Sequence, residues 1–551
     1  MSFEKRRLEI ISLAAEQALK LPFKKDNFWF LDDLRDNFYF ATHLYAAVHE
    51  DTISLSSDKK DSEKLAVEVI LDGLRLQDRS PESDTYGHWP LHLSPKPSVA
   101  QPHPLPAELL SSFFLHFYNV YQDTFPTDLK EELQRSFQHI YESTFLDRVP
   151  ESFSHHESKL YANQLMFGQY FNDQALANRG YKNMKELYEH VNEYGFREYG
   201  ALPWLWHWTQ AVTFARQFVV NTKSSDLLSK LLNLLWKNRV DFYFKGTWIG
   251  AHSRGLPHDI PEDRNNVIDY IQFGDFDIPK ALPRLEGAGF LNHQVSNDLN
   301  DRATSHKKAL EIKKKINMYM ERDKVNHEAI HHYVYMTSDY ALGGIWERTE
   351  EHMNEQHRWD VTLPIQTDGI NQAYFFHPSE DYVAGDERHE SNRSNVMFNK
   401  NVIAATYDLT NSGCNHVIGV LPKGSWLIEE TNLYGLVDQS YFAIHLMHSF
   451  SHEKKEDRML LKSEGKENGV VMEVISTEEA SQYNITSLNQ FKSSMEKQKA
   501  IFQINDNNTL KINYQSIHTD SLSIESSLDL KEKNCKRTVN GEDVNFIDYE
   551  V

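Results

Sequence analysis

The chain has 551 residues, of which 40% are hydrophobic and 25% are charged, a composition typical of soluble globular proteins. A single hydrophobic core stops growing at roughly 250–300 residues, so we expect at least two domains. The net charge of −22 argues against a protein that binds nucleic acid or an anionic membrane, since both need a basic surface. An acidic substrate in a locally basic cleft stays compatible with this charge. The two cysteines, Cys414 and Cys535, are too few for a disulfide framework in so long a chain.

The N-terminal stretch combines basic residues with an apolar run, but it lacks the pattern of a secretory signal. Glu9 and Glu16 interrupt the run, and its apolar residues recur at helical spacing. No stretch of the sequence is long enough and apolar enough to span a bilayer. We therefore expect a cytoplasmic protein that has no membrane partner.

Residues 1–325 are predicted to be helical. Apolar residues recur at helix-like spacing in many segments, for example over 31–44, 110–118 and 227–235. Many amphipathic helices joined by loops favour helix pairs arranged as an (α/α) toroid, an incomplete helical barrel. We interpret the basic segment 302–322 as an amphipathic helix whose charged face is solvated and connects this part to the next.

The pattern changes after about residue 326. Short β-branched or aromatic runs follow, separated by Gly, Asn, Asp and Pro turns, and these predict antiparallel strands in stacked sheets. A helical insert is expected over 478–499. The predicted fold class is therefore α+β and multidomain, with the toroid as catalytic domain over 1–325 and an antiparallel β-sandwich over 326–551.

A glycine-bracketed stretch at 246–259, GTWIGAHSRGLPHD, has the densest group of chemically active side chains. Glycine lets a backbone approach a ligand closely, and binding or catalytic residues often lie in such loops. The stretch places His252 and His258 near Arg254, so proton-transfer groups would lie beside a fixed cation. The alternative is a surface turn with incidental charges.

Other segments share this mixture of residues, and together they resemble the motifs of heparinase II/III-like polysaccharide lyases, in particular an uncharacterised bacterial and fungal branch. The matches follow the expected order over roughly residues 160–410. They are Tyr161 with Asn163, Glu198 to Trp204, His252-Ser253-Arg254, Tyr335 to Tyr340, Gln356-His357-Arg358-Trp359, His377-Pro378 and Asn399-Lys400-Asn401.

The resemblance implies β-elimination on a uronic-acid glycan. A base removes the acidic C5 proton, negative charge builds on the neighbouring carboxyl group, and the leaving glycosidic oxygen receives a proton. Asn163 would neutralise the carboxylate, His252 and Arg254 would face it or act as the base, and His357 would reach in from the sheet. The implied catalytic residues are Asn163, Tyr199, His252, Arg254 and His357. The implied substrate-binding residues are Glu198, Trp204, His207, Trp248, Tyr335 and Arg358.

The sequence departs from the family pattern at Trp204, where relatives place a tyrosine after the proline. Tryptophan cannot act as a proton-transfer base. If the catalytic tyrosine of the family occupies this position, its role passes to Tyr199, His207 or His252, or the activity differs. Trp204, Trp206 and Trp208 are expected to divide between core packing and the lining of a cleft.

Several alternatives stay open. Asn163 could cap a helix or be a buried amide bonded to backbone, and His357 could be an ordinary strand residue. A glycoside hydrolase would need paired carboxylates, for which Glu198, Asp259, Glu262 and Asp339 are candidates. A carbohydrate-binding protein without catalysis is the third reading.

No cofactor is expected, with a structural zinc or calcium ion as the alternative. His327, Glu328, His331 and His332 cluster in the sequence, and His352 and His357 lie downstream, but no Cys or His-Glu-x-x-His spacing supports a metal site. The expected partner is an acidic oligosaccharide, with no nucleic acid and no membrane. A homodimer is compatible with the sequence.

Overall fold

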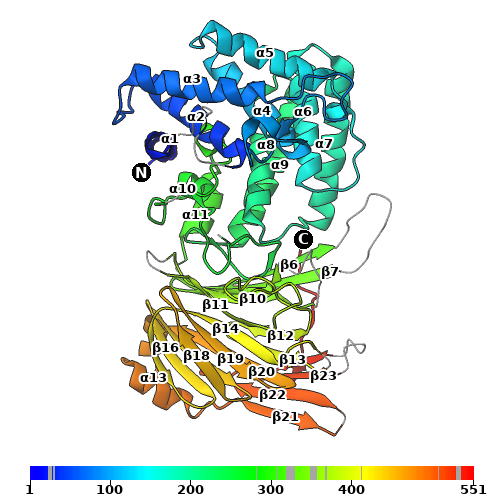
Figure 1. The fold of residues 1–551 in the computed structure, drawn as a ribbon. Helices are drawn as coiled ribbons and strands as arrows, with labels where there is room; N and C mark the ends of the chain where they lie inside the picture. The colour runs from blue at the N-terminus through cyan, green and yellow to red at the C-terminus, as the bar shows by residue number, and fades with distance from the viewer. Residues whose placement is uncertain are drawn as a thin grey trace.

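The computed structural model describes residues 1–22, 28, 32–257, 259–280, 282–306, 308–317, 329–347, 356–365, 369–410, 412–506, 508–528 and 535–551. Helices form the first part of the molecule, and stacked antiparallel sheets form the second (Figure 1). This architecture confirms the predicted fold class. Within these ranges, none of the helices has both the length and the hydropathy to cross a membrane.

The helices alternate between two layers along the chain. Four of them have side chains buried on nearly every face: α2 (Leu34–His49), α4 (Pro104–Tyr121), α6 (His155–Tyr170) and α8 (Leu202–Phe218). The helices between them bury one face and expose the other: α3 (Lys59–Arg75), α5 (Thr127–Glu142), α7 (Gln174–Tyr194) and α9 (Thr222–Asp241). Helices buried on all sides form an inner layer, and amphipathic helices form an outer one. The result is an incomplete (α/α) toroid, completed by α1 (Phe3–Lys20), α10 (Val267–Gln272) and α11 (Asn297–Thr304).

Three antiparallel sheets make up the second part. The eight-stranded sheet has the order β18-β19-β14-β11-β10-β8-β7-β6. Its strands are β6 (Leu310–Asn317), β7 (Ala329–Met336), β8 (Ala341–Ile345), β10 (Trp359–Thr362), β11 (Gln372–Phe376), β14 (His416–Pro422), β18 (Phe450–Lys454) and β19 (Arg458–Glu464). A buried apolar core between this sheet and the next holds the sandwich together, as predicted.

The six-stranded sheet has the order β12-β13-β20-β17-β16-β15, and the five-stranded sheet runs from β21 to β25. The strands of the six-stranded sheet are β12 (Ser394–Asn399), β13 (Val402–Asp408), β15 (Ser425–Ile428), β16 (Asn432–Val437), β17 (Ser440–Leu446) and β20 (Glu467–Ser476). Those of the five-stranded sheet are β21 (Ile501–Asn505), β22 (Thr509–Gln515), β23 (Ser521–Ser527), β24 (Cys535–Val539) and β25 (Glu542–Asp543). The helical insert expected over 478–499 is present as α12 (Thr477–Ser481) and α13 (Leu488–Met495).

The predicted helix at 302–322 is wrong for most of its length. The helix α11 ends at Thr304, and β6 pairs with β7 over its whole length. Ile312 and Ile316 are buried, and a spacing of four residues places two side chains on one face of a helix and of a strand alike. The spacing of these two isoleucines therefore fits a helix and a strand equally. Pairing with β7 makes the segment a strand. Residues 318–322 lie outside the described residues.

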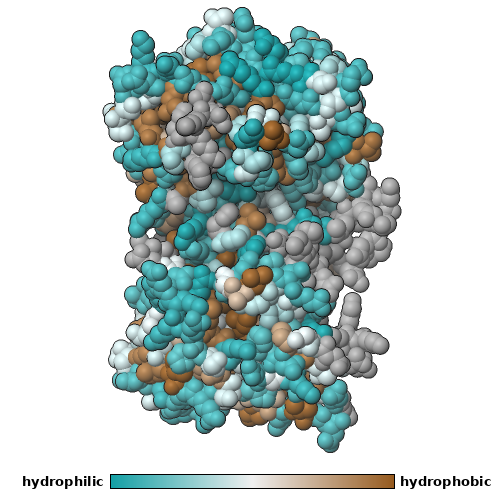
Figure 2. Space-filling model, viewed as in Figure 1, coloured by the Kyte–Doolittle hydropathy of each residue, from teal (hydrophilic) through white to brown (hydrophobic). Residues whose placement is uncertain are grey.

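The helical part and the sheets share a core. Ile312, Ile330, Val334 and Met336, on β6 and β7, belong to the same buried apolar cluster as the helices. A two-stranded sheet adds backbone pairing at this junction, because β5 (His252–Ser253) pairs with β9 (Gln356–His357). Figure 2 shows a mostly hydrophilic face over both parts, with apolar residues in scattered patches.

Candidate functional site

A pocket of about 520 Å³ opens at the N-terminal ends of α6 and α8. Its wall consists mainly of titratable groups, including three arginines, three histidines and four glutamates. A pocket in which charged and proton-transfer groups of both signs converge is a candidate functional site. The lining residues are His103, Pro104, Leu105, Glu108, Arg148, Glu151, Ser152, Phe153, Ser154, His155, His156, Glu157, Arg197, Glu198, Trp204, Ser253 and Arg254.

A histidine–glutamate pair lies in this wall. Oε1 of Glu198 is hydrogen-bonded to Nδ1 of His155. Oε2 of the same carboxylate accepts from the backbone N–H of His155 at 3.0 Å and from Nε1 of Trp208 at 2.8 Å. These donors outweigh burial and hold the pKa of Glu198 well below its usual range, whereas burial lowers the pKa of His155 to about 4. A neutral His155 that donates through Nδ1 keeps a lone pair on Nε2, which is the arrangement of a general base.

Local sequence explains where this pair lies. Ser154 caps α6 in a reciprocal capping box with Glu157, so His155 is the first residue of the helix. Pro203 is in the first turn of α8, and the next residue, Trp204, stacks on the ring of His155 with 5.2 Å between centroids and 4° between planes. The start of α6 therefore positions the backbone of His155, and Trp204 at the start of α8 packs against its ring.

A buried glutamate neighbours this pair. Glu108 is bonded to Nζ of Lys159 at 2.8 Å, to Nδ1 of His156 at 2.7 Å and to Nη1 of Arg148 at 2.9 Å. These charges outweigh burial and hold the pKa of Glu108 well below its usual range. The carboxylate therefore stays ionised and binds its cations rather than donating a proton.

Asn163 lies behind the wall. It is fully buried in the middle of α6 and does not cap the helix. Its Nδ2 donates to the backbone carbonyl of Glu108 at 3.1 Å, so the buried-amide alternative describes this side chain. His155, Lys159 and Asn163 follow one another at intervals of four residues and thus share one face of α6.

Arg254 enters the pocket from the glycine-bracketed loop. Its backbone is left-handed, with φ of 49°, a conformation that costs a residue other than glycine about 1–3 kcal/mol and is concentrated at functional sites. The guanidinium lies 5.0 Å from the ring centroid of Trp204, and its Nε has no hydrogen-bond partner within the described structure. Ser253 holds the loop through two hydrogen bonds to the carbonyl of Tyr199, at 3.0 and 2.9 Å.

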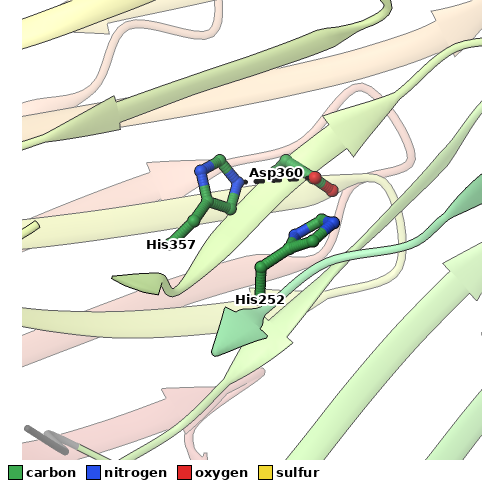
Figure 3. A group of neighbouring side chains, drawn as sticks. All are labelled: His252, His357 and Asp360. Carbon is green, nitrogen blue, oxygen red and sulfur yellow. Dashed lines mark ion pairs between the residues drawn. The ribbon is translucent and has the colours of Figure 1, made fainter. Parts of the chain in front are cut away.

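His252 and His357 meet each other instead of the pocket. They lie directly opposite in the β5–β9 pair, and both are buried. Asp360 joins them, with its Oδ2 3.4 Å from Nε2 of His357 (Figure 3). Burial lowers the pKa of each imidazole to about 3, so both rings are neutral near pH 7. The structure thus separates these two histidines from Glu198, Trp204 and Arg254.

His207 lies just behind the pocket. Its ring centroid is 5.5 Å from that of His155, and its Nε2 is 3.2 Å from Glu286. Trp206 and Trp208 are buried, and only Trp204 of the three tryptophans lines the pocket, so they divide between core and pocket as expected.

The remaining predicted residues are buried and do not line the pocket. They are Tyr199, Trp248, Tyr335 and Arg358. Tyr199 packs edge-on against His332, with 4.9 Å between ring centroids. Arg358 donates from Nη1 to the carbonyl of Ser394 at 3.1 Å.

The histidine cluster that was considered as an alternative metal site lies partly outside the described residues. His327, Glu328 and His352 lie outside the described residues, as does His258 of the loop. Nδ1 of His331 is 2.6 Å from Glu347.

His155, Glu108 and Lys159 were not predicted from the sequence. One signal was available for His155, the Ser-x-x-Glu box at 154–157 that places it at a helix start. The spacing of four residues from His155 to Lys159 and Asn163 was a second. Glu108 lies on α4, and no local pattern links it to α6.

No family model matches the chain, and no curated protein matches it. Among solved structures, a crystal structure of heparinase III matches with a TM-score of 0.46 and 8% identity, over 90% of this chain and 82% of that one. A second heparinase III structure matches with a TM-score of 0.40 and 10% identity, over 95% of this chain and 90% of that one. The endoglucanase CelQ from Clostridium thermocellum, complexed with cellotriose, matches with a TM-score of 0.23 and 7% identity, over 86% and 93%. These likenesses concern the chain path alone.

Proposed function

We propose that this protein cleaves an acidic, uronate-containing oligosaccharide by β-elimination, with His155 as the base. The observation that carries the proposal is the His155–Glu198 pair in the wall of a pocket that also contains Arg254. The glutamate fixes the tautomer of the imidazole and stabilises the imidazolium that forms when Nε2 takes a proton.

Arg254 suits the carboxylate of an acidic sugar. The uronate carboxylate gains negative charge as the C5 proton leaves, and a fixed guanidinium stabilises that charge. Arg254 is our candidate for this role, because its Nε is buried without a hydrogen-bond partner in the described part of the chain. The ring of Trp204 holds this guanidinium in the wall of the pocket, because Arg254 lies over it.

The proposed elimination needs one proton transfer from C5 and one to the leaving oxygen, and His155 can carry out both. Nε2 of His155 takes the C5 proton, the electron pair forms the C4–C5 double bond, and the C4–O bond breaks toward the leaving oxygen. The imidazolium then returns its proton to that oxygen, so one group serves as base and as acid. In this scheme the proton transfer falls to His155, a residue that was not among the replacements expected from the sequence, Tyr199, His207 and His252.

The carboxylates that line the pocket of His155 weigh against a glycosidase at this site. Glycoside hydrolysis needs one carboxylic acid that stays protonated near a second carboxylate. Of the candidates, Glu198 lines this pocket with a lowered pKa, Glu262 lines a different pocket, and Asp259 is fully buried. Asp339 follows β7, in the turn before β8. Interactions also lower the pKa values of the pocket carboxyls of Glu108 and Glu157.

The test is an assay of the full chain on a panel of uronate oligosaccharides. We expect the ultraviolet absorbance of a conjugated double bond to appear, because elimination creates one and hydrolysis does not. His155→Gln should lower kcat/KM by about 10²–10⁴-fold, since glutamine can bond to Glu198 but cannot take a proton.

His92→Gln is the matched control. Its side chain is 63% exposed beside Asp32, outside the pocket, so its activity should equal that of the wild type. Full activity in His155→Gln would refute the assignment of the base. New reducing ends without absorbance would identify a hydrolase, and binding without turnover would identify a carbohydrate-binding protein.

A further inference from the structure

Three buried polar atoms converge at the junction between the helices and the sheets. They are Nε2 of His252, Nε2 of His357 and one carboxylate oxygen of Asp360, and the ligand atoms of this group all lie within 4.8 Å of one another. The three side chains are between 0 and 2% exposed. In Figure 3 both imidazoles lie beside the carboxylate of Asp360, and they come from different elements.

None of these three atoms has a hydrogen-bond partner among the residues that the structure describes. A buried polar group without a partner costs about 1–3 kcal/mol, and more if it is charged. Three such atoms in one place therefore lower the stability of the fold unless a ligand binds them. Nε2 of His252 and Oδ2 of Asp360 each present a lone pair that a cation can satisfy.

The opposite side of His252 and that of Asp360 are already bonded. Nδ1 of His252 lies 2.8 Å from the carbonyl of Gly250, so this nitrogen carries the proton and Nε2 keeps its lone pair. The N–H of Gly250 donates to Oδ1 of Asp360 at 2.8 Å, and Oγ1 of Thr362 donates to the same oxygen at 2.8 Å. Outer hydrogen bonds of this kind orient the imidazole and carboxylate ligands of metal ions.

We propose that His252, His357 and Asp360 bind a zinc ion that links the helical part to the sheets. Two imidazole nitrogens and one carboxylate oxygen are a ligand set that zinc accepts, with water as the fourth ligand. A tetrahedral ion with bonds of about 2.1 Å places its ligand atoms about 3.4 Å apart. Nε2 of His357 and Oδ2 of Asp360 are 3.4 Å apart. Calcium fits poorly, because it prefers six to eight oxygen ligands.

The site has a structural role. His252 lies on β5, in the loop that follows α9, whereas His357 and Asp360 lie on β9 and β10 of the sheet part. None of the three lines the pocket that contains His155. The ion would therefore join two elements that are far apart in the sequence, and it would take no part in proton transfer at His155.

The test is metal analysis of the full chain without an affinity tag, after washing with a weak chelator. We expect one zinc ion per chain in the wild type. In Asp360→Asn and His252→Gln, zinc affinity should fall by more than the roughly 10–100-fold that loss of an outer hydrogen-bond partner costs. His332→Gln is the matched control: this histidine is equally buried in the sheet but outside the group, so its zinc content should equal that of the wild type.

A second measurement uses only the wild-type chain, in case the variants fail to fold. A strong chelator should lower the thermal midpoint, and added zinc should restore it, whereas calcium should not. Cobalt added to the stripped protein should give the visible bands of a four-coordinate ion. Wild-type protein that contains no metal and gains no stability from zinc would overturn the proposal. Full zinc content in both ligand variants would do so as well, because the metal would then lie elsewhere.

Discussion

The chemistry proposed for His155 depends on its immediate neighbours. Glu198 binds the Nδ1 side of the imidazole, and Trp204 covers one face of the ring. Desolvation disfavours the charged imidazolium, so the ring is neutral over a wide range of pH. A base that is neutral at the working pH is ready to accept a proton without first losing one.

The pH dependence of the reaction tests this state. The pKa of His155 is lowered to about 4, so protonation removes the base only as the pH falls through about 4. We expect kcat/KM for a uronate oligosaccharide to stay level from neutral pH down to about pH 5 and then to fall. The measurement is kcat/KM in the free enzyme against pH, which reports the pKa of its essential base. An acidic limb centred near the ordinary histidine value of about 6.5 would point to a more exposed base.

Gly250 decides how the loop of residues 246–259 docks on the sheet. Its φ is +81°, and a Cβ at this position would lie 2.7 Å from the carbonyl carbon of Gly343 and 2.8 Å from the nitrogen of Gly344. Both neighbours are backbone atoms, which cannot turn away as a side chain would. The loop and β8 thus approach each other more closely than any side chain allows.

Gly250→Ala should therefore destabilise the fold. We expect the free energy of unfolding to fall by at least about 1–3 kcal/mol, the cost of one strained backbone position, with the clash adding to it. Urea denaturation measures the change. Gly413→Ala is the control, because its φ is ordinary and no atom lies within 4 Å of an added Cβ. Equal stability of the two variants would contradict this view of the junction.

At the scale of the whole molecule, the helical part shares its core with residues of β6, β7 and β8, while a second core lies within the sandwich. Ile330 on β7 is 2% exposed and belongs to the core of the helices. Lys245 donates to the carbonyl of Ser338, and Arg388 donates to that of Gly255, so side-chain hydrogen bonds cross the same junction. A shared core predicts that both parts lose structure together.

Ile330→Ala tests this coupling. Removing the buried side chain should cost about 2–5 kcal/mol. The helical signal in far-ultraviolet circular dichroism and the aromatic signal in the near ultraviolet should both shift to the same lower thermal midpoint. Ile547→Ala, at a position that is 86% exposed, should leave the midpoint unchanged. Two separate transitions would show that the parts unfold independently.

The sequence by itself determined the order of helices and strands, because the periods of 3.6 and 2 residues are local properties. It also pointed to Glu198, Trp204 and Arg254, which line one pocket. It could not decide between helix and strand at Ile312 and Ile316, since their spacing suits both.

Only the tertiary structure brought distant groups together. His155 and Glu198 are 43 residues apart, and Gly250 and Asp360 are 110 residues apart. It also turned His252 away from the pocket while Arg254, two residues later, lines it. Side-chain direction and burial depend on which strand the loop meets, and that contact is not a local property of the sequence.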